Sequence, residues 1–144
     1  MNQRASSAAL PPDFPSELAV TAFVSGEETA WKPADALASV EWFGAHGYAV
    51  LGTELWLLQD GWIQSLPIGT SGLREVHGNT VNSNKDEDWN SFVGRSTTET
   101  AAYLRGFNPA DIVEKGDLHF QVSWIDQKDF EDLLARRGRY GLLA

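Results

Sequence analysis

Two runs of strand-forming residues on either side of an Asp-Gly pair constrain this chain most. The first run covers 48–58 and the second covers 62–66. Between them, Gln59-Asp60-Gly61 favours a tight turn, because Gly accepts the positive φ that such a turn needs. The pattern predicts an antiparallel hairpin, and Gly52 inside the first run predicts a bulge or a close backbone approach.

Hydrophobic periodicity places further elements on both sides of this hairpin. Apolar residues at three- and four-residue steps predict a helix that begins at Pro33 and stops near Gly44 and Gly47. Segment 118–125 alternates and predicts a strand with Leu118, Phe120, Val122 and Trp124 on one face and His119, Gln121 and Ser123 on the other. Asp126 is expected to cap a C-terminal helix.

Other segments are less regular. Residues 18–24 are apolar with β-branched members, which favours a strand. Segment 67–85 is polar and predicts a long loop of a kind that is often functional or disordered. A helix is expected after Asp86-Glu87-Asp88, and Ser96-Thr97-Thr98-Glu99 either starts a second helix or lies inside one longer helix.

The order of these elements predicts an α+β fold. A chain of 144 residues suits one domain, and the hairpin requires antiparallel pairing. We therefore expect a single domain over 17–144, with helices packed on one face of a small, mostly antiparallel sheet. Residues 1–16 are small and Pro-rich, and they predict a loose N-terminal arm that Asp13-Phe14-Pro15 could hold in place.

Composition excludes several classes of site and partner. The chain has no Cys, so it has no disulfide and no thiolate metal site. Its formal net charge of −9 argues against nucleic acid as a partner. We recognise no targeting segment and no run of ~20 apolar residues that would cross a membrane, so we expect a cytoplasmic protein.

The sequence shows no motif of an enzyme or of a metal site. The three histidines, His46, His77 and His119, share no ligand spacing, and we expect neither a metal nor a cofactor. No Ser lies in a nucleophile-elbow pattern, and segment 69–72 lacks the Lys of a phosphate-binding loop. We therefore expect no catalytic residues.

Glu54 stands alone among Leu and Trp residues of the first hairpin run. Burying an unpaired carboxylate costs several kcal/mol, so Glu54 is expected to be paired, protonated or directed at solvent. Two interpretations stay open: an exposed strand residue, or a carboxylate directed at a ligand or partner.

Six tryptophans are an unusual number for this length. Trp42 and Trp124 fit a core, and Trp89 fits the docking of its helix. Trp56 and Trp62, on the two arms of the hairpin, could share an open face as a sugar-binding platform or a protein interface.

Acidic residues cluster at 86–88 and at 126–132. Solubility and helix N-terminal electrostatics explain such clusters, but a negative surface that attracts a basic protein partner explains them equally well. The candidate partner-binding residues are Glu54, Trp56, Trp62, Asp86, Glu87, Asp88 and Trp89.

A family resemblance favours the second explanation. The helix 34–44, the run Gly47-Tyr48-Ala49-Val50-Leu51-Gly52-Thr53-Glu54-Leu55-Trp56-Leu57 and the Asp-Gly hairpin resemble small bacterial immunity proteins of the immunity protein forty kind, over about residues 33–107. The resemblance implies an intracellular α+β protein that binds and blocks a toxin domain without catalysis, with Glu54, Trp56 and Trp89 at matching positions. The polar segment 67–85 and the N-terminal arm depart from it.

Three functions therefore compete at this point. The first is an inhibitor whose acidic surface binds a basic toxin domain. The second is a ligand-binding module with Trp56 and Trp62 as a stacking platform. The third is a hydrolase that uses Glu54 with another carboxylate or with His119.

Overall fold

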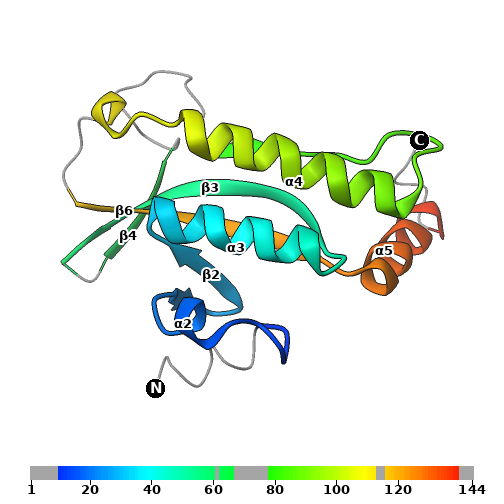
Figure 1. Ribbon diagram of the computed structural model, residues 1–144, viewed down its shortest axis with the longest axis horizontal. Coiled ribbons are helices and arrows are strands. Elements are labelled where there is room, and N and C mark those ends of the chain that lie inside the picture. The colour runs from blue at the N-terminus through cyan, green and yellow to red at the C-terminus, as the bar shows by residue number, and fades with distance from the viewer. Residues whose placement is uncertain (1–9, 61, 67–77, 113–115, 140–144) are drawn as a thin grey trace.

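A computed structural model describes residues 10–60, 62–66, 78–112 and 116–139 (Figure 1). The elements are, in chain order, α2 (Ser16–Ala19), β1 (Phe23–Ser25), β2 (Glu28–Trp31), α3 (Pro33–Ala45), β3 (Ala49–Gln59), β4 (Trp62–Leu66), β5 (Gly78–Thr80), α4 (Trp89–Gly106), the 3-10 turn η1 (Pro109–Asp111), β6 (Asp117–Ile125) and α5 (Gln127–Arg139). They form an α+β domain, as the sequence predicts.

The strands form one sheet in the order β1-β2-β6-β3-β4, and every pairing is antiparallel. The predicted hairpin is confirmed, because Gln59 pairs with Trp62 and Asp60 has a φ of 51°. Strands β5 and β4 pair with successive parts of the same side of β3: β5 pairs with Gly52–Glu54, and β4 pairs with Leu55–Gln59. Thus β3 is an interior strand, with β6 on one side and β4 and β5 on the other.

Helices α3 and α4 run side by side over one face of this sheet (Figure 1). The core between the two layers contains fully buried Trp31, Phe43, Leu55 and Phe120. Each large apolar side chain buried in this way contributes roughly 1.5–3 kcal/mol. The apolar side of β6 faces this core, as the alternation predicts.

Glycines determine where α3 ends and how closely α4 approaches it. Helix α3 continues past Gly44, and a Cβ at that position would overlap the Thr97 side chain of α4. The stop is Gly47, with a φ of 84°, after which the Tyr48 N–H donates to Phe43 O at 2.9 Å. Gly44 therefore permits close helix packing instead of ending the helix.

The bulge predicted at Gly52 is confirmed. The register between β3 and β6 shifts between Val50 and Gly52, and a Cβ on Gly52 would overlap the Asn79 carbonyl. Near this shift the Val50 N–H donates to the buried Ser96 Oγ at 3.0 Å. Ser96 lies inside one continuous helix α4, which decides between the two alternatives left open by the sequence.

The N-terminal part of the chain differs from the sequence expectation in two places. The expected arm is held against the domain from Leu10 onward, because Leu10 and Phe14 are buried in the core and the Phe14 ring lies 5.4 Å from that of Phe43, in line with the anchoring considered for Asp13-Phe14-Pro15. Residues 1–9 lie outside the described part. The strand expected over 18–24 is a helical turn followed by β1 from Phe23, and β2 was not expected at all.

The polar segment 67–85 is only partly described. Residues 67–77 lie outside the described part, whereas Gly78–Thr80 form β5 and Val81 is buried. Asn79 fixes β5 between the sheet and α4: its Oδ1 accepts from Thr53 Oγ1 at 2.6 Å, and its Nδ2 donates to Thr100 Oγ1 at 2.9 Å. Residues 78–80 of the expected loop are therefore a strand of the sheet.

Candidate protein-binding surface

The structure does not bring the predicted partner-binding residues together. Strand β4, which begins with Trp62, lies at one end of the long axis, and α5 lies at the other (Figure 1). Helix α4 begins beside α5, because the Trp89 ring lies 5.5 Å from the ring of Phe130. The candidates on the hairpin and those before α4 therefore belong to different regions.

The two hairpin tryptophans form no shared platform. Trp62 pairs with Gln59, and directly paired residues of antiparallel strands point to the same face. Trp56 precedes Gln59 by three residues, so strand alternation directs it to the opposite face. Trp62 is 77% exposed, but Trp56 is only 4% exposed and packs against Phe23. This geometry contradicts the stacking-platform hypothesis.

Glu54 points to the same sheet face as Trp56. The carboxylate accepts a hydrogen bond from Trp56 Nε1 at 3.3 Å, and the residue is half-buried. The partner of Glu54 on β6 is Gln121, and the partner of Trp56 is His119. Glu54 and Trp56 therefore belong to a polar and aromatic cluster on this face, away from the start of α4.

His119 and Gln121 in this cluster are only 7% and 6% exposed. Gln121 Nε2 donates to Ser123 Oγ at 3.0 Å. Burial lowers the pKa of His119, the Asp117 carbonyl opposes that shift, and the charge of Lys32 adds to it. The side of β6 that carries polar residues is therefore largely shielded from solvent.

The acidic triplet before α4 has three different environments. Arg95 Nε and Nη2 each donate to the Glu87 carboxylate at 2.8 Å, and the Asn84 N–H donates to it at 2.9 Å. The hydrogen bonds from Arg95, followed by that from Asn84, lower the pKa of Glu87 to about 2. Arg95 thus balances the charge of Glu87 within the protein, and partner binding by Glu87 stays a prediction.

The other two members of the triplet stay exposed. Asp88 is the N-cap of α4, and its Oδ1 accepts from the Ser91 N–H at 2.7 Å. Asp86 has a φ of 67°, which Asp tolerates better than most residues. Both remain candidates for contact with a basic partner.

Trp89 fixes the start of α4 against the rest of the domain, as predicted. Its Nε1 donates to the Gly47 carbonyl at 3.2 Å, and its ring packs on Phe92 and Phe130. This contact places the start of α4 beside the end of α3. Trp89 is half-buried, so part of its ring reaches the surface.

Aromatic rings also stack at the C-terminal end of α3, around the Gly47 turn. The rings of Trp42 and Tyr48 stack at 6.0 Å, and His46 stacks on Trp42 at 4.0 Å. Burial raises the pKa of Tyr48, and the negative charges of Asp13 and Asp126 raise it further. The charges of two carboxylates from distant parts of the chain therefore act on the Tyr48 hydroxyl, and the pairing of Ala49 with Ile125 places Tyr48 and Asp126 at the same end of β3 and β6.

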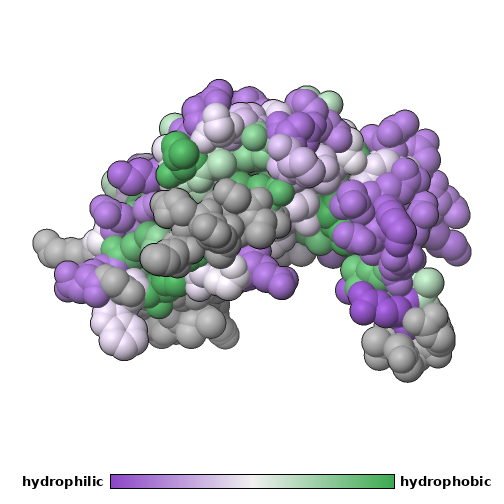
Figure 2. All heavy atoms as spheres, turned by 90° about the horizontal axis from the view of Figure 1, so that it is seen from below, coloured by the Kyte–Doolittle hydropathy of each residue, from purple (hydrophilic) through white to green (hydrophobic). Residues whose placement is uncertain are grey.

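Together these groups form a half-buried aromatic patch with exposed carboxylates. We call it the aromatic–acidic surface, and it consists of Asp13, Trp42, Tyr48, Asp88, Trp89 and Asp126. Figure 2 shows hydrophilic residues gathered over the end of the molecule that carries α5. The sequence named Asp88 and Trp89 as partner-binding candidates, but it did not reveal Asp13, Trp42, Tyr48 or Asp126 as their neighbours.

The carboxylates of this surface have no basic partner in the described part of the chain. The ion pairs found there join Arg95 with Glu87 and Glu99, Arg105 with Glu41, and Lys128 with Asp132. Asp126 instead caps α5, accepting from the Asp129 N–H at 2.8 Å. The surface thus keeps its negative charge.

The described residues contain no group of three or more His, Cys, Asp or Glu side chains able to hold a metal ion. No helix in this part of the chain has the length and apolar character needed to cross a membrane.

Comparison of the chain with protein-family models, curated proteins and solved structures finds no match.

Proposed function

We propose that this protein is a non-enzymatic inhibitor that binds a basic protein domain through the aromatic–acidic surface, in the way an immunity protein binds a toxin. The observation that carries the proposal is the position of Tyr48. Its ring stacks with Trp42, on which Phe14 beside Asp13 also packs, and the pairing of Ala49 with Ile125 brings Asp126 to the same end of the sheet. Aromatic side chains surrounded by carboxylates are complementary to a surface rich in Arg and Lys.

Each component of this surface has a physical role in such binding. Trp and Tyr are frequent hot spots because they bury a large area with few rotatable bonds. A cationic side chain placed over a Trp or Tyr ring gains about 0.5–2 kcal/mol. Carboxylates around the rings speed association with a basic partner and disfavour acidic ones.

The surface is also held rigidly before any partner arrives. It is built from the ends of α3, α4 and β6, and the hydrogen bond from Trp89 to Gly47 joins two of these ends. Phe14, next to Asp13, packs edge-on against Trp42 at 5.0 Å. A preorganised surface loses less conformational entropy on binding.

The direct test is calorimetric titration of a toxin domain encoded by a neighbouring gene into the full chain and a triple variant. The variant Asp13→Asn/Asp88→Ser/Asp126→Ser removes three charges, and Ser at 88 and 126 preserves both helix caps. The matched control Glu27→Gln/Glu28→Gln/Asp111→Asn removes three exposed charges elsewhere.

We expect the surface variant to bind about 10–100-fold more weakly, with a smaller salt dependence, whereas the control changes affinity less than about 3-fold. The same domain should lose its toxic activity when the wild-type chain is bound. Equal weakening by both variants would mean that net charge, and not this surface, determines binding. Failure of the wild-type chain to bind any such basic domain would refute the proposal.

A further inference from the structure

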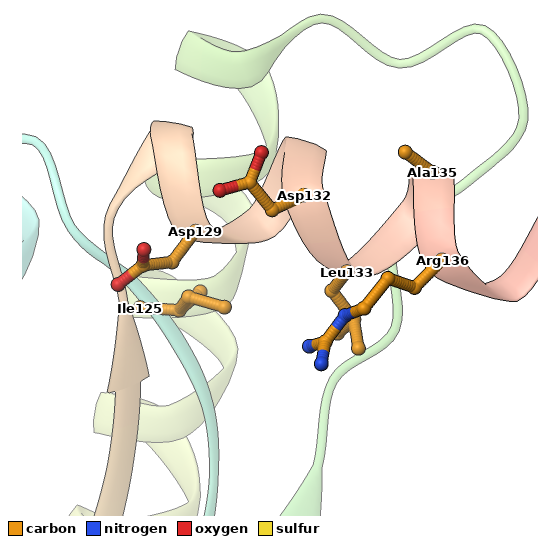
Figure 3. A pocket seen from close by; sticks show the side chains of 6 residues that line it. All are labelled: Ile125, Asp129, Asp132, Leu133, Ala135 and Arg136. Atoms are coloured by element: carbon orange, nitrogen blue, oxygen red, sulfur yellow. The ribbon is translucent and has the colours of Figure 1, made fainter.

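A hollow of about 520 Å³ lies beside α5. Figure 3 shows the side chains that line it. It is lined by Ile125, Asp129, Asp132, Leu133, Ala135 and Arg136. Its size is within the range of about 300–1,000 Å³ that is usual for binding pockets. The hollow is therefore large enough to receive side chains from another molecule.

The way α5 is anchored leaves this face of the helix available. Phe130 fixes α5 to the domain, with its ring 5.5 Å from Trp89 and 5.3 Å from Phe92. Asp129, Leu133 and Arg136 are spaced by four and three residues, so they follow one face of the helix. Asp129 lies one turn from Asp126, so the hollow continues the aromatic–acidic surface.

The lining combines apolar and charged groups. Ile125 and Leu133 supply apolar contact, and Asp129 is an exposed carboxylate that takes part in no ion pair with the described residues. Asp132 forms an exposed ion pair with Lys128, with Oδ2 3.0 Å from Nζ, and water screens this pair. Arg136 extends to the same side of the helix as Leu133 (Figure 3).

We infer that this hollow receives an arginine side chain and an adjacent apolar side chain from the basic partner. The arginine stem lies against Ile125 and Leu133 and its guanidinium meets Asp129, while the apolar neighbour fills the remaining space. This inference rests on the proposed function and names the element of the partner that enters the site.

The chain offers matched pairs of positions on the same helix. Asp129, Leu133 and Arg136 line the hollow, whereas the exposed residues Glu131, Leu134 and Arg137 lie outside it. Asp129→Asn and Glu131→Gln remove one negative charge each. Arg136→Gln and Arg137→Gln remove one positive charge each, and Leu133→Ala and Leu134→Ala truncate one apolar side chain each.

The probe is a capped hexapeptide of alternating Arg and Leu, titrated into the ¹⁵N-labelled full chain. We expect shifts at the amides of Ile125, Asp129 and Leu133. Asp129→Asn and Leu133→Ala should weaken binding about 3–10-fold and Arg136→Gln should strengthen it about 2–5-fold. Each change outside the hollow should alter affinity less than about 2-fold, and circular dichroism should show that α5 stays folded in every variant.

Three results would overturn the inference. They are an absence of shifts at these amides, equal effects of the lining and outer positions, or equal binding of an alternating Glu and Leu hexapeptide. The proposed function is judged separately, by titration of the toxin domain. If the triple surface variant binds the toxin domain more weakly, but the lining and outer substitutions of α5 have equal effects on affinity, the function stands and the hollow is not used. If only the peptide result holds, the hollow binds basic segments and the inhibitor proposal fails.

Discussion

Gly44 of α3 lies so close to Thr97 of α4 that a Cβ at position 44 would overlap the Thr97 side chain. This contact sets the spacing between the two helices that cover the sheet. Helix α3 also carries Trp42 and ends at the Gly47 turn, so the position of α3 determines where both lie. The geometry of the aromatic–acidic surface therefore depends on a position with no side chain.

Gly44→Ala should lower the free energy of unfolding by roughly 1–3 kcal/mol, because added volume in a packed interface forces the helices apart. Gly94→Ala is the matched control, since a Cβ there meets nothing within 4 Å. In a helix interior that change should stabilise by about 0.5–1 kcal/mol. Urea unfolding measures both, and equal effects would show that Gly44 is not a close contact.

Ser96→Ala should lower the free energy of unfolding by about 1–3 kcal/mol, because it removes the Oγ that accepts from the Val50 N–H near the β3 register shift. Ser39 is the comparison, since it is fully buried in α3 and its Oγ has no hydrogen-bond partner among the described residues. Ser39→Ala should therefore be neutral or stabilising. Denaturant midpoints of the two variants give the answer, and the opposite order would contradict the assigned bond.

His119 predicts a loss of stability in mild acid. Burial lowers its folded-state pKa below the ordinary value of 6.5, so the unfolded chain binds the proton more readily. This contribution is present above pH 6.5 and is lost as the pH falls from there toward the folded-state pKa. Unfolding free energies from pH 8 to 5 should fall more steeply for wild type than for His119→Gln. Identical slopes would contradict the burial of a neutral imidazole.

Glu87 and Asp88 should separate stability from binding. The pKa of Glu87 is lowered to about 2, so its contribution is present above 4.5 and is lost as the pH falls toward 2. Glu87→Gln should flatten this acid dependence and leave partner affinity within about 2-fold, since Arg95 already neutralises Glu87. Asp88→Ser should instead weaken partner binding, and Ser should preserve the N-cap of α4. Acid titration and calorimetry together check both, and a large loss of affinity in Glu87→Gln would contradict the pairing.

Much of the fold could be predicted from local chemistry. The turn at Asp60, the bulge at Gly52 and the cap at Asp126 depend on residues that are close in sequence. Strand β5 escaped prediction because three residues, Gly78–Thr80, carry no periodicity, and they pair through their backbone with β3.

The site was harder to predict, for two different reasons. The sequence already implied that Trp56 and Trp62 point to opposite faces. A two-residue turn places Gln59 opposite Trp62, and strand alternation directs Trp56, three residues before Gln59, to the other face. The sequence alone could not predict that the charges of Asp13 and Asp126 act on Tyr48, because this depends on how the N-terminal segment and β6 pack around α3.

The most direct test of the central claim compares two tryptophans in one titration with the basic toxin domain. Trp42 belongs to the aromatic–acidic surface, and Trp62 is exposed at the opposite end of the molecule (Figure 1). We predict that Trp42→Ala weakens binding at least about 10-fold, after circular dichroism has shown it to be folded, and that Trp62→Ala has no effect. A loss of affinity in Trp62→Ala with none in Trp42→Ala would contradict the account.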